Sequence, residues 1–414
     1  MAGPVSPPMA ADRDRAGEQY AVLLAVAGQP LAMIEVAWRD VYCAVWFFDQ
    51  QRRRAFLVDC RQLTDGRLFV AGGRQWAYTT ADQDEFDERV TWGEYWISPG
   101  GGEGGGVYIG SATPDTRIDR MVKSADHWLD APQFGEWGRF IRAFPGHLAA
   151  LGHELSPVLT LADRTDPNAH GLPDGMRPWH PPRPLQPANL DLLFSPGAQL
   201  VVGSREPIQG VGGAVIVEVL EAGTLRMPSG ALIACDPTYL NAGERGTPGA
   251  YQEAHQPFTA TVAPGEYPVL LSVFRWVSGT GPAEAAAKVV TRNEPVVSWE
   301  MGLRPGQDLR ILPNEGFFGF GVDAGTGCFF DAVAAPAMAR LAQDFALGYK
   351  RTAELSDPES GANLIAFHSG WGDGDYPTWV GRTASGDVAC FIADMQLFDK
   401  IDPDPGTDAH QDAA

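Results

Sequence analysis

Positive charge is scarce in this chain. Its 31 lysines and arginines face 52 aspartates and glutamates, which leaves a formal net charge of −21 at pH 7. A protein that binds the phosphate backbone of nucleic acids needs many basic residues, because its affinity comes from neutralising phosphates and releasing their counterions. The same shortage argues against a polybasic membrane anchor. We therefore expect no nucleic acid and no membrane surface as partner, and a basic protein as the partner that such a chain would attract.

Cysteines are few, and their spacing follows no metal or disulfide pattern. No two of them form a CxxC pair, and their number is odd; they are Cys43, Cys60, Cys235, Cys328 and Cys390. This argues against a disulfide framework and against a cysteine-rich zinc site. The simplest interpretation is a set of buried, reduced thiols in a cytoplasmic protein.

Long apolar runs are also missing. No segment reaches the roughly 18 to 20 uncharged apolar residues that a membrane-spanning helix needs. Residues 21–28 follow two arginines, as in a signal peptide, but acidic residues are interspersed with those arginines and Gly28-Gln29-Pro30 leads at once into a second apolar segment. This pattern predicts a β-hairpin rather than an export signal.

Turn-forming residues are abundant. The chain contains 48 glycines and 33 prolines, which favours short strands joined by turns. From residue 21 to residue 109, short apolar segments alternate with turn pairs such as Arg39-Asp40 and Asp65-Gly66, which predicts an antiparallel meander or barrel. Helices are expected over 115–130 and 134–143, where they would form a helical layer on this sheet.

Two motifs in the N-terminal half of the chain each have a structural and a functional interpretation. The glycine-rich stretch Gly100–Gly106 could be a phosphate loop, but it lacks the GK[ST] ending and is expected to be a hairpin loop. Arg52-Arg53-Arg54 is expected to be a solvated turn, with a patch for an acidic partner as the alternative.

The second half predicts an antiparallel β-sandwich with one inserted helix over 332–349, so the fold class is mainly β with two β-rich domains. The expected organisation has five parts: a disordered segment 1–18, an N-terminal β-rich accessory domain 19–154, a proline-rich linker 155–187, a C-terminal domain 188–398 and an acidic disordered tail 399–414.

Four ordered motifs stand in the C-terminal domain. They are Met227-Pro228-Ser229-Gly230 with Ala234-Cys235-Asp236-Pro237, then Gly265-Glu266-Tyr267-Pro268-Val269, then Gly321–Asp331, and finally Gly370–Pro377 with Gly381. From about residue 228 to residue 398 the chain resembles the bacterial domain-of-unknown-function family numbered 4241. The resemblance implies no activity, and residues 1–160 lie outside it.

Asp373 and Asp375 alternate with glycines in the last motif. Carboxylates on such a loop could coordinate a hard divalent cation such as Ca²⁺ or Mg²⁺. Asp-Gly pairs are also the preferred residues of tight turns, because Asp accepts local N–H groups and Gly adopts positive φ. Both interpretations remain open, and the distal Glu of an EF-hand is absent.

The third motif places Asp323 and Asp331 at the two ends of a glycine-rich segment. Asp331 is expected to cap a helix or, alternatively, to bind a metal ion. Gly325, Thr326 and Gly327 could offer backbone N–H groups to an anionic ligand, with Asp323 as a ligand or base. His368 and Tyr376, beside the last motif, complete the candidate ligand-binding residues.

Two classes of function follow from these residues. The first is a non-enzymatic binding, accessory or immunity-like protein, because the chain is strongly acidic and carries no complete catalytic motif. The second is a metal-dependent hydrolase-like enzyme with a carboxylate site in the C-terminal domain. The first class is preferred.

The domain boundaries can be tested by limited proteolysis. We expect a protease to cut within 155–187 or near Gly100–Gly106 and to leave two resistant fragments, since exposed segments rich in Pro and Gly are preferred cleavage sites. A single resistant core that retains an uncut 155–187 segment would contradict this organisation.

Overall fold

The structure, a computed structural model, describes residues 6–99, 102–109, 116–121, 124–152, 180–202, 213–244, 256–277, 283–343, 345–370 and 372–397. The expected tail 399–414 and most of the expected linker lie outside these ranges. The chain divides into two compact units, one of Met1–Pro184 with Asp308–Gly316 and one of Leu185–Gln307 with Phe317–Ala414.

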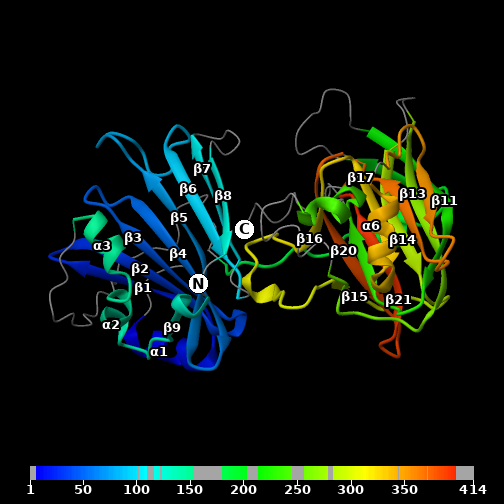
Figure 1. The fold of residues 1–414 in the computed structure, drawn as a ribbon. Coiled ribbons are helices and arrows are strands. Elements are labelled where there is room, and N and C mark those ends of the chain that lie inside the picture. Colours follow the sequence, from blue (N-terminus) through cyan, green and yellow to red (C-terminus); the bar gives the residue numbers. More distant parts are fainter. Residues whose placement is uncertain are drawn as a thin grey trace. The chain divides into compact units, whose positions relative to one another are not determined.

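The first unit is built on one antiparallel sheet in which β1 to β8 pair in chain order and β9 pairs with β5 (Figure 1). The strands are β1 Tyr20–Val26, β2 Gln29–Ala37, β3 Tyr42–Phe48, β4 Arg54–Thr64, β5 Arg67–Ala77, β6 Thr91–Ile97, β7 Gly102–Ile109, β8 Thr116–Met121 and β9 Trp128–Asp130. The predicted antiparallel meander is confirmed.

Short helices cover one face of this sheet. They are α1 Pro7–Ala16, α2 Trp137–Ile141 and α3 Pro145–Ala150, with the 3₁₀ helices η1 Trp38–Asp40 and η2 Ser124–His127. Phe140 and Leu148 of the helices share one buried cluster with Ile34, Val45 and Val58 of the sheet. Burial of these apolar side chains stabilises the contact between the helices and the sheet.

Two predictions for this unit are wrong. Residues 115–130 are not one helix, because Phe69 of β5 pairs with Trp128 and the segment forms β8, η2 and β9 instead. The expected disorder of 1–18 fails for Pro7–Ala16, because Asp14 of α1 accepts hydrogen bonds from Tyr20 Oη at 2.6 Å and Trp38 Nε1 at 2.7 Å. Tertiary contacts thus decide the structure of both segments.

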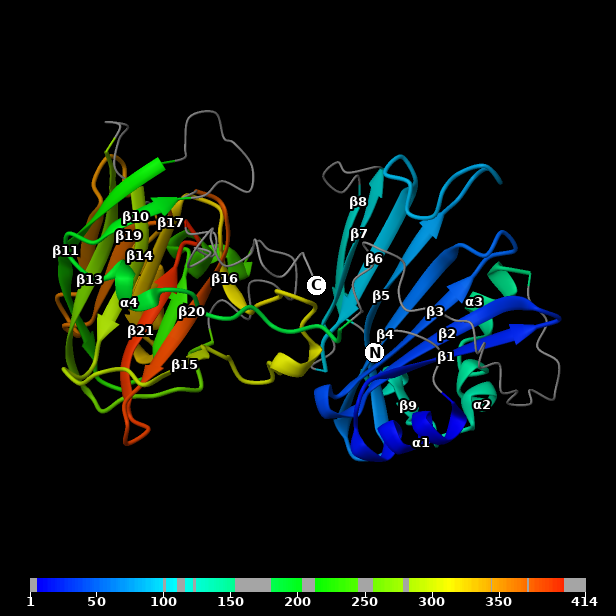
Figure 2. The same cartoon turned by 180° about the vertical axis from the view of Figure 1, so that it is seen from behind.

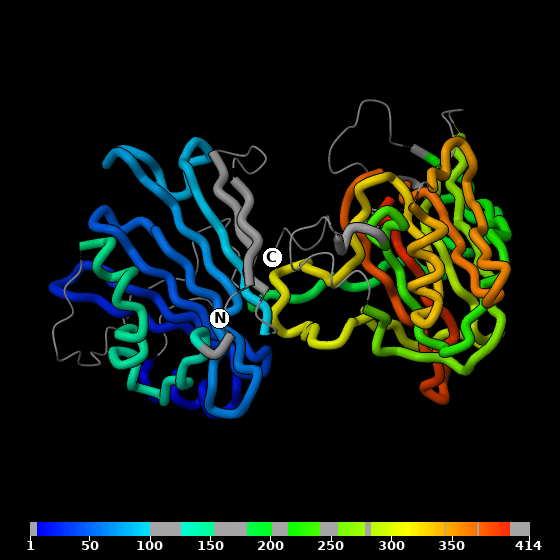
Figure 3. The backbone as a smooth tube through the Cα atoms, viewed as in Figure 1, coloured from blue at the N-terminus to red at the C-terminus, as the bar shows by residue number. Residues whose placement is uncertain are grey.

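Asp308–Gly316 comes from the second half of the chain but belongs to the first unit, and it lies in the yellow part of the tube in Figure 3. It contains the 3₁₀ helix η4 Leu309–Ile311. Ile311 packs against the cluster of Phe69, and the buried Arg61 guanidinium donates to the carbonyl of Leu312 at 3.4 Å. The chain therefore passes between the two units three times.

The second unit contains two antiparallel sheets (Figure 2). The larger has the order β10-β11-β13-β14-β21-β20-β15, with β16 also on β20, and the smaller has the order β12-β17-β19-β18. Their strands are β10 Gln199–Val202, β11 Gly213–Met227, β12 Leu232–Cys235, β13 Gly265–Trp276, β14 Ala283–Val290, β15 Ser298–Met301, β16 Gly319–Val322, β17 Thr326–Asp331, β18 Thr352–Ser356, β19 Asn363–His368, β20 Gly374–Arg382 and β21 Val388–Asp394.

The two sheets face each other, and helices cover the smaller one. Ile365 of β19 lies against Gly223 of β11, at 3.0 Å from the position that a Cβ atom on this glycine would take. On the opposite face of the smaller sheet, Phe330 and Leu364 pack with Met338 of α6. The helices on the smaller sheet are α6 Ala335–Leu341 and the 3₁₀ helices η3 Pro237–Glu244 and η5 Ala332–Ala334. The short helix α4 Leu190–Leu193 contacts the larger sheet, because the carbonyl of Leu193 accepts a hydrogen bond from Ser272 Oγ of β13. The mainly β fold with two β-rich units is confirmed.

The helix predicted over 332–349 is wrong beyond Leu341. Tyr349 is fully exposed, and Gly348 has a positive φ of 63°. The residues after α6 instead form an irregular segment whose Leu347 is buried. Within the described ranges, no helix has the length and apolar character needed to cross a membrane.

His147 of α3 gives the first unit a measurable dependence on pH. Its ring stacks on Phe47, with centroids 5.3 Å apart, and burial lowers its pKa. The unfolded chain therefore binds the proton more readily, so the free energy of unfolding should fall as the pH drops below the unfolded pKa of about 6.5.

We expect His147→Phe to reduce this loss of stability on acidification, because the new ring keeps the stacking and cannot be protonated. Chemical denaturation at neutral and mildly acidic pH measures the difference. The matched control is His180→Phe at an exposed position, which should keep the wild-type difference. Equal pH dependence in wild type and His147→Phe would refute the assignment.

Candidate functional site

Three loops of the second unit meet where β12, β16 and β19 end. Asp236, directly after β12, is fully buried, and its Oδ2 accepts hydrogen bonds from the backbone N–H groups of Asp323 at 2.8 Å and Ala324 at 2.9 Å. Its Oδ1 accepts from Thr238 N at 2.8 Å and Oγ1 at 2.7 Å. The carboxylate thus joins the second half of the first motif to the third motif.

The last motif joins the same place through Gly325, which has a positive φ of 60°. Its N–H donates to Asp373 Oδ1 at 3.1 Å, and its carbonyl accepts from Ser369 N at 3.2 Å. The Nδ1 atom of His368 lies 3.2 Å from the same carbonyl. We call Asp236, Asp323, Ala324, Gly325, His368, Ser369, Gly372 and Asp373 the loop junction.

Gly372 and Tyr376 complete the packing of the last loop. The carbonyl of Gly372 accepts hydrogen bonds from Ser369 Oγ at 2.6 Å and from Tyr376 Oη at 2.9 Å. The ring of Tyr376 packs against Phe320, with the two ring centroids 6.2 Å apart. Burial raises the pKa of Tyr376. Tyr376 is therefore buried beneath the loop and holds it by a hydrogen bond, and it does not face solvent.

Other candidate residues lie in the sheet. Thr326 is buried in β17, and a Cβ atom on Gly327 would lie only 2.7 Å from the ring of Phe367. Thr326 and Gly327 are therefore the first residues of a strand, and Gly325 directly precedes it, whereas η5 begins with Ala332 at the other end of β17. The expected cradle of N–H groups at a helix start is not formed by these residues.

Asp331 lies at that other end of β17 and is fully buried. It accepts hydrogen bonds from Ser229 N at 3.0 Å, Ser229 Oγ at 2.7 Å, Gly230 N at 3.0 Å and Val333 N at 3.0 Å. The structure places it as the cap of η5 and as the anchor of the first motif, as the capping interpretation predicted.

Asp323 and Asp373 of the loop junction are exposed, and so is Asp375, two residues after Asp373. Among the residues that the structure describes, no ion pair involves any of the three, and no group of three or more His, Cys, Asp or Glu side chains is arranged to hold a metal ion. The Ca²⁺ or Mg²⁺ site stays a prediction.

A pocket of about 680 Å³ opens near the Asp331 end of the domain. Its lining combines apolar side chains, such as Pro228, Val333 and Ala337, with charged residues of both signs, which are Arg226, Arg340, Glu266, Asp357 and Glu359. Arg226 donates to the carbonyl of Gly361 at 2.9 Å, and Arg340 to that of Pro336 at 3.1 Å. The volume is typical of ligand pockets. Sequence reasoning missed it because its residues come from four separate segments of the chain.

The loop junction and the pocket lie within the part of the chain that matches a known family model. Residues 225–393 match the model of a family described as protein of unknown function (DUF4241). This confirms the resemblance stated for the C-terminal half, and we call the matched region the family domain. No curated protein and no solved structure matches the chain.

The buried and exposed carboxylates of the family domain should respond differently to neutralisation. We expect Asp331→Asn to lower the free energy of unfolding by about 3 kcal/mol, because the new amide would turn N–H groups toward N–H donors in a buried site. Asp323→Asn is the matched control and should leave the stability unchanged, because its carboxylate is exposed. Urea denaturation followed by circular dichroism measures both; equal effects would contradict the assigned roles.

Proposed function

We propose that this is a non-enzymatic binding protein whose family domain presents the loop junction to a basic protein partner. The observation that carries the proposal is the set of exposed carboxylates on two neighbouring loops, Asp323 on one and Asp373 with Asp375 on the other. Loops held on a rigid sheet are common binding surfaces.

The loops are fixed before any partner arrives. Asp236 holds Asp323 and Ala324 by their backbone, and Gly325 holds Asp373 by its carboxylate. A fixed loop loses little conformational entropy on binding, which favours affinity. The net charge of −21 adds a long-range attraction for a basic surface, and salt screens this attraction.

The groups that could perform catalysis are engaged in the fold. Cys328 is fully buried, donates to the carbonyl of Cys235 at 3.2 Å, and has a pKa raised by burial, which disfavours the nucleophilic thiolate. Each ring nitrogen of His368 lies 3.2 Å from a carbonyl oxygen, one of Gly325 and one of Gly348. An accessory or immunity-like role fits these observations better than a metal-dependent hydrolase does.

We further infer that the protein works in the reducing cytoplasm of a bacterium. All five cysteines are buried and free. Cys235 and Cys328 lie directly opposite each other on β12 and β17 with their sulfur atoms 3.8 Å apart, and they remain thiols. Reduced neighbouring thiols are typical of cytosolic proteins.

The partner can be tested by affinity capture from the source cells at low and high salt. We expect the wild type to enrich a basic protein at low salt. The variant Asp323→Asn/Asp373→Asn/Asp375→Asn should capture at least about tenfold less of this protein, because Asn can keep the loop hydrogen bonds but carries no charge. The matched control Asp65→Asn/Asp84→Asn/Glu88→Gln removes the same formal charge from exposed positions of the first unit.

Two outcomes would contradict the proposal. One is equal loss in the junction variant and in the control, which would mean that net charge rather than the junction attracts the partner. The other is saturable binding of Ca²⁺ or Mg²⁺ in calorimetric titration that disappears in Asp373→Asn, which would support the metal-dependent alternative.

A further inference from the structure

The first unit carries a row of tryptophans on the sheet face opposite its helices. Trp46 of β3 stacks on Trp76 of β5, with ring centroids 5.8 Å apart and planes at 27°. Trp76 pairs across the sheet with Trp92 of β6, and the alternation of side chains along β6 puts Trp96 on the same face. Trp96 is 44% exposed. We call these four residues the tryptophan strip.

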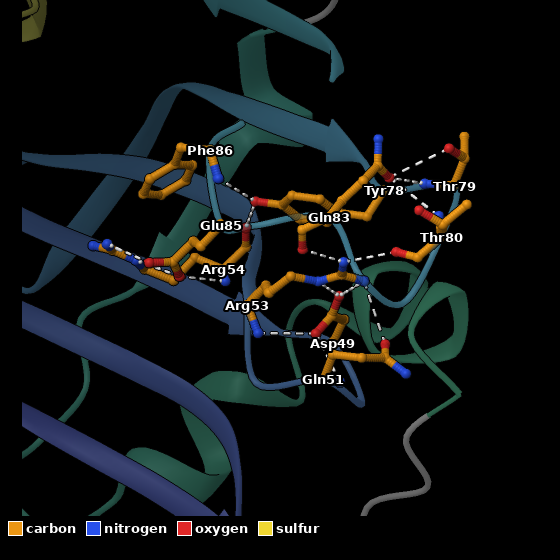
Figure 4. A network of polar contacts seen from close by, with 10 residues as sticks. All are labelled: Asp49, Gln51, Arg53, Arg54, Tyr78, Thr79, Thr80, Gln83, Glu85 and Phe86. Carbon is orange, nitrogen blue, oxygen red and sulfur yellow. Dashed lines mark hydrogen bonds and ion pairs between the residues drawn. The ribbon is translucent and has the colours of Figure 1, made fainter. Parts of the chain in front are cut away.

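A loop between β5 and β6 stands beside the strip and is held by the arginines of the β3–β4 turn (Figure 4). Arg53 is buried and donates to the carbonyls of Thr80 and Gln83, both at 2.9 Å. Arg54 binds Glu85 through Nε at 3.0 Å and Nη2 at 2.9 Å. The expectation of a solvated arginine turn is therefore wrong for Arg53 and Arg54, because their guanidiniums fix the loop, whereas Arg52 is exposed in the turn.

The loop adds a fifth ring to the strip. Phe86 lies 4.8 Å from Trp76 and 6.0 Å from Trp46 between ring centroids, and it is 37% exposed. Its φ is 58°, a left-handed conformation that a bulky residue keeps only where its surroundings enforce it. Tyr78 Oη, which accepts from Phe86 N at 3.1 Å and donates to Arg54 O at 3.0 Å, is part of that enforcement.

Charged groups alternate with these rings. Glu35 accepts a hydrogen bond from Trp46 Nε1 at 3.1 Å, and Arg74 pairs with Glu94 at 3.2 Å beside Trp92. The Arg54 guanidinium lies 5.0 Å from the Trp46 ring and 4.6 Å from the Phe86 ring, and that of Arg74 lies 5.7 Å from the Trp92 ring. The chain's own arginines thus already place positive charge beside these rings, where it would repel a further cation.

The alternation limits the chemistry of a ligand. A purely apolar partner would bury the Arg54–Glu85 and Arg74–Glu94 pairs, whose desolvation is costly. A nucleic acid would bring its phosphates to these glutamates in a chain of charge −21, and a cationic ligand would be repelled by the positive charge of Arg54 and Arg74. A neutral ligand with flat C–H faces and hydroxyl edges matches both kinds of group, because its faces can stack on the rings while its hydroxyls bind the carboxylates and guanidiniums.

We propose that the tryptophan strip binds a neutral oligosaccharide. The sugar rings stack on Trp92, Trp96 and Phe86, and Glu94 with Arg74 accepts from and donates to their hydroxyls. The proposal concerns the first unit and uses no residue of the loop junction, so it stands or fails independently of the proposed protein partner.

The experiment is a calorimetric titration of the full chain with cellohexaose, xylohexaose, maltohexaose and chitohexaose, with tryptophan fluorescence as a second signal. We expect saturable binding of at least one of them and a loss of at least about tenfold in affinity in Trp96→Ala and in Trp92→Ala. The control is Trp38→Phe, which changes a tryptophan that donates to Asp14 away from the strip. It should bind like the wild type.

Because truncation of a half-buried ring can disturb folding, Glu94→Gln provides a second test that keeps side-chain size. It should weaken binding while the thermal unfolding midpoint stays within the range of the control. Absence of saturable binding to all four oligosaccharides by the wild type would overturn the proposal. Binding of equal affinity in wild type, Trp96→Ala and Trp92→Ala would overturn it as well.

Discussion

The family domain depends on buried carboxylates that bind backbone N–H groups of distant loops. Asp236 and Asp331 are both fully buried, and the four hydrogen bonds that each accepts replace the water lost on folding. One lies at each end of the smaller sheet. An uncompensated charge at either position would cost more than most single contacts contribute, so the loops and the carboxylates must assemble together. The main role of these two motif aspartates is thus to fix loops to the strands.

The two units carry different kinds of side chain on their antiparallel sheets. In the second unit, the outward side of the fixed loops carries carboxylates. In the first unit, the outward side of the sheet carries aromatic rings, and Arg53 and Arg54 fix a loop by donating to carbonyls and to Glu85. Both arrangements rely on buried or half-buried charges to hold loop backbone in one conformation. Such preorganisation favours binding, because the ordering of the loops does not have to accompany the arrival of a ligand.

Periodicity and turn chemistry predicted the strands of the first unit well. The alternation along Leu31–Trp38 and Val41–Phe48 fits a half-buried sheet, and β2 and β3 lie there. The same reasoning failed for 115–130 and for 345–349, where helical spacing of apolar residues was misleading. In the first case pairing with β5 decides the structure, and in the second the chain leaves the helix after Leu341 and exposes Tyr349.

The site was predictable only in part. Glycines and aspartates at strand ends marked the third and last motifs as candidate site loops, and Gly325 and Asp373 of these two motifs do meet. The role of Asp236 as the link was not predictable, because its partners Asp323 and Ala324 contribute backbone rather than side-chain atoms. The tryptophan strip was missed since its members are separated in sequence and become neighbours only through strand register.

Asp308–Gly316 has a consequence for the synthesis of the chain. The sheet of the first unit receives Ile311 and the Leu312 carbonyl from a segment that leaves the ribosome after Leu185–Gln307, the first part of the second unit. Domains at the N-terminus usually fold first during translation. Here the nascent first unit must wait, with Phe69 and Arg61 still lacking these contacts, until Leu185–Gln307 of the second unit has been made. The two units are therefore coupled in the order of their biogenesis even though each has its own sheets and its own core.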